Sequence, residues 1–417
     1  MRTRTPTSPK TAVRRLAIGR LISVTGGAAA YTALNFTVWD RTHSPSMQAL
    51  SLLLTFGVAG ILGPFAGALG DRFDRRRVMI ASEAVASAFF IAMVFVEDPG
   101  LLIAIAFGSA IAELPFFSAS RAAIPNLVEH EEDISWANSL ITVGVHAGIA
   151  VGPLLGGLIV AGAGARWVFG INAVSFVISL VLTITVHGRF ADPVREVSQD
   201  EDRGITAGIR FLFGEAVLRR MSLAWVVFVL GMGMGMVADA PIAESFGTGA
   251  TGFGFLIAAW GTGSVLGSAA GRWMNVRTEP VWLVLGSVCI AASAIGVGLA
   301  PWFWLVLACL LVMGTADGLT IVAENGILQR RTPDAVRSRT MAAFEALLSL
   351  GLFVAYLAAI PVLRAIEPQR VYLLGGIAAA AAALVLVPLL ALRREAAEVP
   401  ELGPEIPVAA AWESRVE

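Results

Sequence analysis

Ionisable side chains interrupt several of the long apolar stretches of this sequence. A charged group inside hydrocarbon is costly, so such residues commonly bind a cation or substrate, or carry a proton. Three of them lie within about two turns of the end of their stretch, where a long side chain can extend to the membrane surface; these are Glu83, Glu244 and Glu345. The complete set comprises Glu83, Glu113, His146, Asp239, Glu244, Asp317, Glu324 and Glu345.

Glu113 and His146 form the best-matched pair for sharing a proton. Glu113 precedes Arg121 by eight residues and His146 follows Trp136 by ten. At about 1.5 Å per helical residue, the two lie ~12 and ~15 Å from the same membrane face. A carboxylate and an imidazole at similar depth can share a proton. Two simpler interpretations stay open, in which Glu113 pairs with Arg121 or His146 is a satisfied polar residue between helices.

Asp317 and Glu324 are seven residues apart, so they lie on one face of a helix. We expect this face either to take part in cation or substrate binding or to pair internally with arginine side chains. Together with Glu113 and His146, these two acids are the candidates for proton coupling.

Asp239 follows the flexible, methionine-containing segment 231–236 near the end of another apolar stretch. Methionine side chains adapt to irregular ligands, although lipid-facing packing is the alternative for this segment. Trp260 falls in the middle of an apolar stretch, whereas tryptophan is enriched near membrane interfaces. Asn35 is also enclosed in an apolar stretch. We assign Asp239, Trp260 and Asn35 to a substrate cavity.

The elements that position these residues are membrane helices. The chain has 417 residues, of which 56% are hydrophobic and 15% charged, and its mean hydropathy is +0.75. The hydrophobic share and the mean hydropathy exceed those of soluble globular proteins, and a helix needs ~20 apolar residues to cross the hydrocarbon. We therefore predict an all-α integral membrane protein. Its twelve predicted spans are residues 16–38, 47–69, 78–96, 100–120, 135–162, 167–187, 221–245, 252–274, 280–300, 302–325, 339–361 and 371–392.

Lysine and arginine are distributed very unevenly between the alternate loops that connect the predicted spans. If the N-terminus is cytoplasmic, 26 of the 30 Lys and Arg residues fall on the cytoplasmic side and four on the other. This distribution predicts a multi-pass protein of the plasma (inner) membrane with both termini in the cytoplasm. The predicted segments are a cytoplasmic N-terminal segment (1–15), two helix bundles (16–187 and 221–392), a cytoplasmic linker (188–220) and a disordered cytoplasmic tail (393–417).

Several other kinds of chemistry are excluded by what the sequence lacks. Lys10 is the only lysine, so there is no Walker A loop for ATP hydrolysis. Cys289 and Cys309 both fall inside predicted spans, which leaves no disulfide framework and no metal-binding set. Residues 247–252 match the GxGxxG pattern but follow no strand, which argues against a dinucleotide site. We accordingly expect no enzyme activity, no cofactor, no metal and no nucleic-acid partner.

An internal repeat relates the two halves of the chain. When the sequence is aligned with itself at a shift of 200 residues, the basic ends of the second predicted span of each half coincide. A second similarity relates residues 121–128 to residues 329–336. Two such halves, joined by residues 188–220, are typical of duplicated transporters. The first shift superimposes Gly67, Arg72 and Arg77 on Gly267, Arg272 and Arg277.

Charge is concentrated in one short stretch, where residues 71–77 include six charged side chains in seven positions. With Gly67, this stretch resembles the signature loop of the major facilitator superfamily, the secondary transporters built from two six-helix bundles. Asp74 replaces the glycine that is usual in that loop. The resemblance implies a gating latch that closes against helix eleven when the cytoplasmic side is shut, whereas the arginines alone would be a topology signal. The latch residues are Gly67, Asp71, Arg72, Arg75 and Arg76.

Glycines recur at every fourth position in the predicted spans 135–162 and 252–274. Small residues at this spacing let helices approach closely in lipid. The pattern in the first span resembles a motif of the drug–proton antiporter branch of the superfamily. The resemblance implies that the two spans meet between the halves, where the glycines serve packing or coupling. These interface residues are Gly148, Gly152, Pro153 and Gly156 in the first span and Gly263 and Gly267 in the second.

Residues 121–128, the acidic residues that follow them and residues 137–140 resemble the macrolide-efflux and siderophore-exporter group. The resemblance implies a monomeric, proton-coupled antiporter that expels a bulky, partly apolar small molecule of the drug or siderophore class by alternating access. Its partners would be that substrate, protons and the lipid bilayer. An uptake symporter of the same fold is one alternative. A non-transporting receptor or scaffold is another, although it would not need the buried acids.

Overall fold

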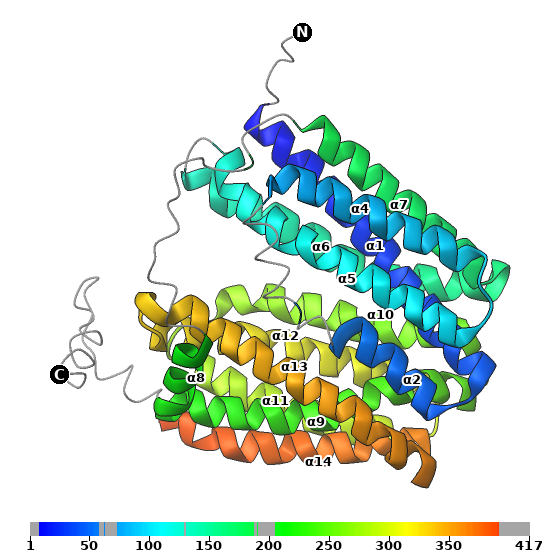
Figure 1. The fold of residues 1–417 in the computed structure, drawn as a ribbon. Helices are drawn as coiled ribbons and strands as arrows, with labels where there is room; N and C mark the ends of the chain where they lie inside the picture. The colour runs from blue at the N-terminus through cyan, green and yellow to red at the C-terminus, as the bar shows by residue number, and fades with distance from the viewer. Residues whose placement is uncertain are drawn as a thin grey trace.

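The structure, a computed structural model, describes residues 8–57, 62, 73–128, 131–186, 190 and 205–391. In the first half of the chain, long helices run back and forth beside one another (Figure 1). Their bounds are α1 (Pro9–Thr42), α2 (Pro45–Leu52) with a π-helical continuation η1 (Leu53–Gly57), α4 (Arg75–Val94), α5 (Pro99–Leu127), α6 (Glu131–Ala163) and α7 (Ala165–Thr185).

The second half of the chain begins with a short helix inside the predicted linker 188–220. This helix packs against the start of α13, where a Cβ on Gly208 would meet the main chain of Arg339. The elements of this half are α8 (Ile205–Gly214), α9 (Ala216–Ser245), α10 (Gly249–Ala270), the 3-10 turn η3 (Gly271–Trp273), α11 (Glu279–Leu299), α12 (Phe303–Arg331), α13 (Asp334–Ala365), α14 (Pro368–Leu386) and the 3-10 turn η4 (Val387–Ala391).

Helix starts follow from local sequence. Asp98 precedes α5 and its Oδ1 accepts a 2.7 Å hydrogen bond from the Leu101 amide, while Pro99 fills the first turn, where no amide partner is needed. Glu215 precedes α9 and its Oε2 accepts a 2.6 Å bond from the Leu218 amide. These caps satisfy amide groups that a helix leaves unpaired at its start.

Among the described residues, eleven helices are long and apolar enough to cross a membrane. They coincide with eleven of the twelve predicted spans. The other predicted span, 47–69, begins as α2 and η1 and continues into residues that lie outside the described part of the chain. The predicted all-α membrane fold is confirmed.

The two halves repeat one pattern of helix contacts. In the first half, α1 packs on α6 and α7, and α4 packs on α5 and α7. In the second half, α9 packs on α13 and α14, and α11 packs on α12 and α14. Helix α1 therefore corresponds to α9, α4 to α11, α5 to α12 and α7 to α14. The repeat seen in the sequence is a repeat of structure.

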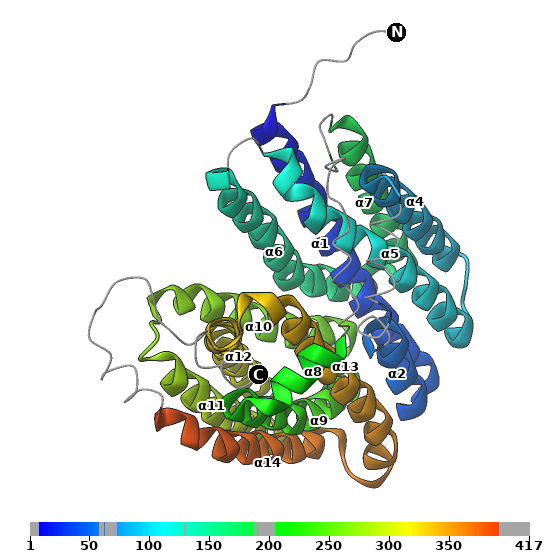
Figure 2. The same ribbon diagram turned by 60° about the vertical axis from the view of Figure 1, so that its left-hand side comes forward.

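Three hydrogen bonds between the halves, all between described residues, lie at one end of the helices, which we call the outer end because the charge distribution predicts that it faces outside. Trp39 Nε1 donates a 2.5 Å bond to Glu244 Oε2, and His43 Nε2 lies 2.9 Å from Glu244 Oε1. Arg364 of α13 donates a 2.8 Å bond to Ser46 Oγ of α2. Figure 2 shows the two groups of helices, with α2 reaching toward α13. These contacts hold the outer ends together.

Candidate functional site

A cluster of three charged side chains lies inside the N-terminal half. Arg20 of α1 and Glu83 of α4 are 7% and 2% exposed, and Glu113 of α5 is half-buried. The Arg20 guanidinium attracts both carboxylates. It also lies 5.1 and 4.7 Å from the ring centres of Phe116 and Phe117. Two acids therefore share one cation that also lies beside two aromatic rings.

Hydroxyl groups complete this cluster. Ser179 and Thr183 of α7 donate hydrogen bonds to Glu83, the second at 3.4 Å, and Ser109 donates to Glu113 at 3.2 Å. Glu83 does not extend to the membrane surface, as its position in the sequence would allow, because its side chain points into the bundle. The arrangement can tie α1, α4, α5 and α7 together, and either carboxylate can hold a proton.

The structure does not bring Glu113 and His146 together. His146 is exposed, and its Nδ1 lies 3.0 Å from the Thr142 carbonyl oxygen of its own helix. Glu113 instead faces Arg20. The expectation of a shared proton is corrected, because similar depth on consecutive helices does not determine where each side chain points. The side chain of Arg121, the alternative partner of Glu113, lies outside the described residues.

Asp317 and Glu324 lie inside the C-terminal half and are 8% and 7% exposed. Helices α5 and α12 both have 29 residues, and Asp317 is the fifteenth residue of α12 as Glu113 is of α5. Asp317 is therefore the structural counterpart of Glu113. Within the part of the chain that the structure describes, neither carboxyl group of α12 makes an ion pair or a hydrogen bond. The expected alternative of arginine pairing is not found there.

All three tyrosines of the chain surround Asp239 of α9. Tyr372 Oη of α14 donates a 2.6 Å hydrogen bond to Asp239 Oδ1. Tyr31 of α1 and Tyr356 of α13 lie close enough for the Asp239 charge to act on their hydroxyl groups. Because α1 belongs to the other half, this tyrosine cluster spans both halves. A carboxylate among phenol groups can bind a proton, a cation or the polar part of a substrate.

Amide groups adjoin the tyrosine cluster. Asn35 Nδ2 donates a 3.0 Å hydrogen bond to the Tyr31 carbonyl oxygen, and Gln48 Nε2 donates a 3.5 Å bond to Asn35 Oδ1. The Gln48 Oε1 atom and the Ser51 hydroxyl are buried and find no hydrogen-bond partner among the described residues. Asn35 and Asp239, both assigned to the substrate cavity from sequence, therefore both adjoin Tyr31.

Trp260 is placed apart from this group. It lies on α10 with 37% of its surface exposed, and its carbonyl oxygen packs against Gly314 of α12.

Two residues of this region, Tyr31 and Gln48, were not predicted from the sequence. For Tyr31, the sequence does contain an indication. Tyr31 falls in the middle of a predicted span and not near the interfaces where tyrosine is enriched.

The predicted latch is described only in part. Gly67, Asp71 and Arg72 lie outside the described residues. Arg76 donates to the carbonyl oxygen of Ile184, and Arg75 donates at 3.3 Å to that of Phe190. These two arginines thus contact the end of α7 and the residues after it, inside their own half. Asp74 caps α4 by accepting a 2.9 Å bond from the Arg77 amide.

The glycine stripes pack inside their own halves. A Cβ on the stripe of α6 would meet α1, and a Cβ on the stripe of α10 would meet the main chain of α12. Helices α6 and α10 do pack on each other between the halves, as the resemblance implies, but the glycine stripes do not form that contact, because the spacing of small residues predicts a close contact but not its partner. The residues concerned are Gly148, Gly152 and Gly156 on α6 and Gly263 and Gly267 on α10.

Helices α6 and α10 do meet between the halves, through other residues. A Cβ on Gly254 would lie 2.7 Å from the Pro153 carbonyl oxygen, and a Cβ on Gly157 would lie 2.5 Å from the Ala250 carbonyl oxygen. Pro153 is therefore the one predicted interface residue of α6 whose described contact crosses to the other half, and Gly157, the next glycine of the same motif, crosses beside it. The contact runs from the outer part of both helices to Gly261, where an added Cβ would lie 3.6 Å from Ala150 Cα.

The family model of the Major Facilitator Superfamily matches residues 16–356 and 235–415. The chain therefore belongs to this superfamily, and the protein is a membrane transporter of that class. The resemblance seen in the loop at residues 67–76 is confirmed.

Curated relatives include the enterobactin exporters EntS of Escherichia coli O127:H6 (strain E2348/69 / EPEC) and of Shigella boydii serotype 18 (strain CDC 3083-94 / BS512). Each is 26% identical over 335 residues, which cover 79% of this chain and 79% of the relative.

Solved structures share the fold. A bacterial homologue of the human lysosomal transporter Spinster, inward-facing and unoccupied, matches with a TM-score of 0.67 at 15% identity, over 93% of this chain and 97% of that one. The nucleoside transporter NupG (D323A mutant) matches with a TM-score of 0.70 at 14% identity, over 91% and 99%. A POT family transporter in complex with a thioalcohol-conjugated peptide matches with a TM-score of 0.72 at 9% identity, over 92% and 96%.

Proposed function

We propose that this transporter is a proton-driven exporter that expels a bulky, partly apolar small molecule of the drug or siderophore class. Export is supported by the curated relatives, which are enterobactin exporters. Proton coupling rests on one observation, the buried acid pair Asp317 and Glu324, which makes no ion pair within the described residues. Carboxyl groups enclosed in a membrane bundle can take up a proton at one face and release it at the other.

We assign the coupled proton to Asp317 and Glu324 in preference to Glu113. Glu113 shares the positive charge of Arg20 with Glu83, and hydroxyl groups complete their hydrogen bonds. The acid at the equivalent position of the C-terminal half, Asp317, has no such cation among the described residues. Glu113 therefore serves mainly to stabilise the N-terminal half, and the pair on α12 responds to protons.

Substrate contact is assigned to the tyrosine cluster between the halves. Asp239, Tyr31 and Asn35 offer a carboxylate, a phenol and an amide. Met234 and Met236 pack in the same region and can adapt to an apolar surface. Because Tyr31 and Asp239 belong to different halves, separation of the outer ends would pull the cluster apart and release a bound compound.

Transport then proceeds by alternating access. The outer ends are in contact, as expected of the state that receives substrate from the cytoplasm. The loop at residues 67–76 would act as the latch when the inner ends close. We place both termini and the linker 188–220 in the cytoplasm, the helices in the inner membrane, and the working unit in a single chain.

Transport in cells tests this function. The measurement is the accumulation of a panel of dyes, macrolides and siderophores in cells with and without the protein, before and after collapse of the proton gradient. The exporter should lower accumulation of its substrate, and the difference should vanish when the gradient collapses. Asp317→Asn should abolish the difference, whereas Glu367→Gln, at an exposed acid at the outer end, should preserve it. Higher accumulation with the protein would indicate uptake and contradict the proposal.

A further inference from the structure

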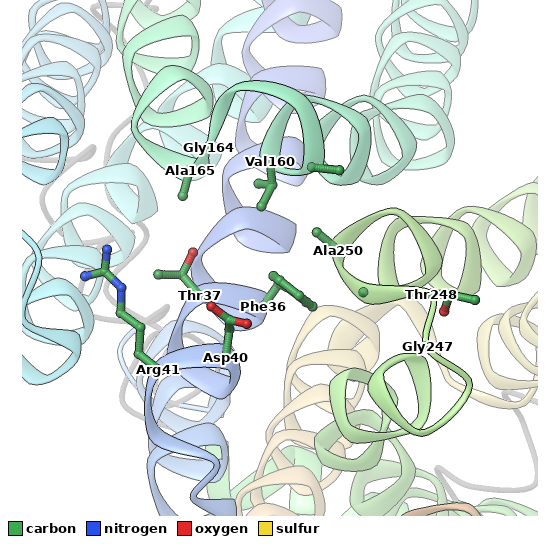
Figure 3. A pocket seen from close by; sticks show the side chains of 12 residues that line it. Phe36, Thr37, Asp40, Arg41, Val160, Gly164, Ala165, Gly247, Thr248 and Ala250 are labelled. Carbon is green, nitrogen blue, oxygen red and sulfur yellow. The ribbon is translucent and has the colours of Figure 1, made fainter.

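A pocket of about 420 Å³ lies at the outer end of the helices, beside α1 (Figure 3). Its walls come from three segments: residues 36–41 of α1, residues 160–165 around the turn between α6 and α7, and residues 247–250 at the turn into α10. The first two segments belong to the N-terminal half and the third to the C-terminal half. The volume falls in the range of about 300–1,000 Å³ that is typical of small-molecule sites.

Asp40 supplies the free charge of this pocket. Within the described part of the chain, its carboxylate makes no ion pair or hydrogen bond. The two nearby arginines are both engaged by residue 97: Arg41 donates to the Glu97 carbonyl oxygen, and Arg166 lies 3.6 Å from the Glu97 carboxylate. In Figure 3 the Asp40 carboxylate lies beside the Phe36 ring, and the Arg41 guanidinium extends to the other side.

This pairing of groups favours one kind of ligand. A carboxylate attracts a cation, and an aromatic ring adds a cation–π contact with the same positive group. Val160 and Ala250 contribute apolar surface nearby. The ligand that matches these groups is a small organic cation that carries an apolar body.

Glycine turns line the pocket. Gly164, Gly247 and Gly249 have φ angles of 93°, 68° and 56°, and they are the described glycines with positive φ. All three line the pocket. A Cβ on Gly164 or Gly247 would meet nothing within 4 Å, so these turns are free of neighbouring side chains on that side. Tight turns without side chains bring the main chain of both halves to the edge of the pocket.

We propose that this outer pocket binds a small organic cation with an apolar body, and that the bound cation holds the outer ends of the two halves together. The pocket exists because residues 36–41 and 247–250 face each other across the halves. Movement of the halves apart would dismantle it. A ligand that binds only one conformation stabilises that conformation, so occupation should slow any cycle that requires the outer ends to open.

Binding is tested first, with purified full-length protein in detergent. The probe is 2-phenylethylammonium, and 2-phenylethanol serves as its nearly isosteric neutral control. Calorimetry should detect the ammonium but not the alcohol. Asp40→Asn should weaken binding roughly tenfold, as expected for the loss of one charge-assisted contact, and Glu367→Gln, at an exposed outer acid beyond the pocket, should not change it. Equal binding of both compounds, or unchanged binding by Asp40→Asn, would overturn the proposal.

The effect on the halves is tested by cross-linking. Ser46→Cys and Arg364→Cys place one thiol on each half where the native side chains are 2.8 Å apart, in a background that lacks Cys289 and Cys309. A short bismaleimide should join them faster when 2-phenylethylammonium is present. The same increase with Asp40→Asn, or no increase at all, would contradict the proposal. Because neither test measures transport, failure here leaves the exporter proposal untouched.

Discussion

The Tyr372 hydroxyl donates a 2.6 Å hydrogen bond to Asp239, which ties α14 to α9 within the C-terminal half. Tyr31 approaches the same carboxylate from the N-terminal half. This tyrosine cluster is therefore both a packing element of one half and a contact between the two. Its two roles lead to different expectations for single substitutions.

Tyr372→Phe should reduce the free energy of unfolding by about 1–3 kcal/mol, because it removes the donor to a buried carboxylate. Tyr356→Phe is the matched control, since the Tyr356 hydroxyl is 3.6 Å from the Met236 sulfur, a weak acceptor. It should cost clearly less. Denaturant unfolding in mixed micelles measures both variants. An equal reduction in the free energy of unfolding for both variants would show that the hydrogen bond to Asp239 does not contribute more than the contact with Met236.

Arg20→Gln should destabilise the protein by about 3–5 kcal/mol, the range for removing one partner of a buried ion pair. The substitution leaves Glu83 and Glu113 facing each other without their shared cation. Arg20→Lys keeps the charge and should cost less, and adding Glu113→Gln to Arg20→Gln should restore part of the loss. Thermal unfolding in detergent gives the order of these variants. A wild-type midpoint for Arg20→Gln would refute the assigned role.

Gly267→Ala should lower the thermal midpoint, because the added Cβ would meet the main chain of Thr315. Gly162→Ala is the control, since a Cβ there meets nothing within 4 Å. In a helix, alanine is favoured over glycine by roughly 0.5–1 kcal/mol, so this control should be neutral or stabilising. If both variants behave alike, the α10–α12 contact is looser than described.

The orientation predicts which positions an impermeant thiol reagent can reach in whole cells. In a background without Cys289 and Cys309, a cysteine at Ser46 should be labelled from outside and one at Ser198 should be protected. Permeabilised cells provide the control, in which position 198 should also react. Labelling of position 198 together with protection of position 46 in intact cells would reverse the topology.

The helices could be predicted from sequence because each apolar run is itself the signal. The run at 16–38, for example, lies within α1, and the run at 280–300 nearly coincides with α11. The loop at residues 67–76 identified the superfamily for a similar reason, since its charges and glycine are contiguous in the chain. Such local patterns need no knowledge of which helix packs on which.

Side-chain neighbours could not be predicted in this way. The spacing of the glycines that include Gly148 indicates a close contact with another helix, but only the fold shows that this helix is α1. Glu113 and His146 were predicted to lie together because they are at similar depth in the membrane. In the structure the two side chains point in different directions around their helix axes, and Glu113 faces Arg20. The tyrosine cluster likewise joins residues 31, 239, 356 and 372, which no local pattern connects.

The central claim, that export is exchanged for protons, is tested most directly in everted membrane vesicles acidified inside by respiration. The exported compound, identified from the cellular panel, is added outside while a pH-sensitive dye follows the gradient. Wild-type and Glu367→Gln vesicles should lose internal acidity as the compound enters, and Asp317→Asn vesicles should not. Entry of the compound without loss of acidity, or protons that move inward with it, would contradict proton-driven export.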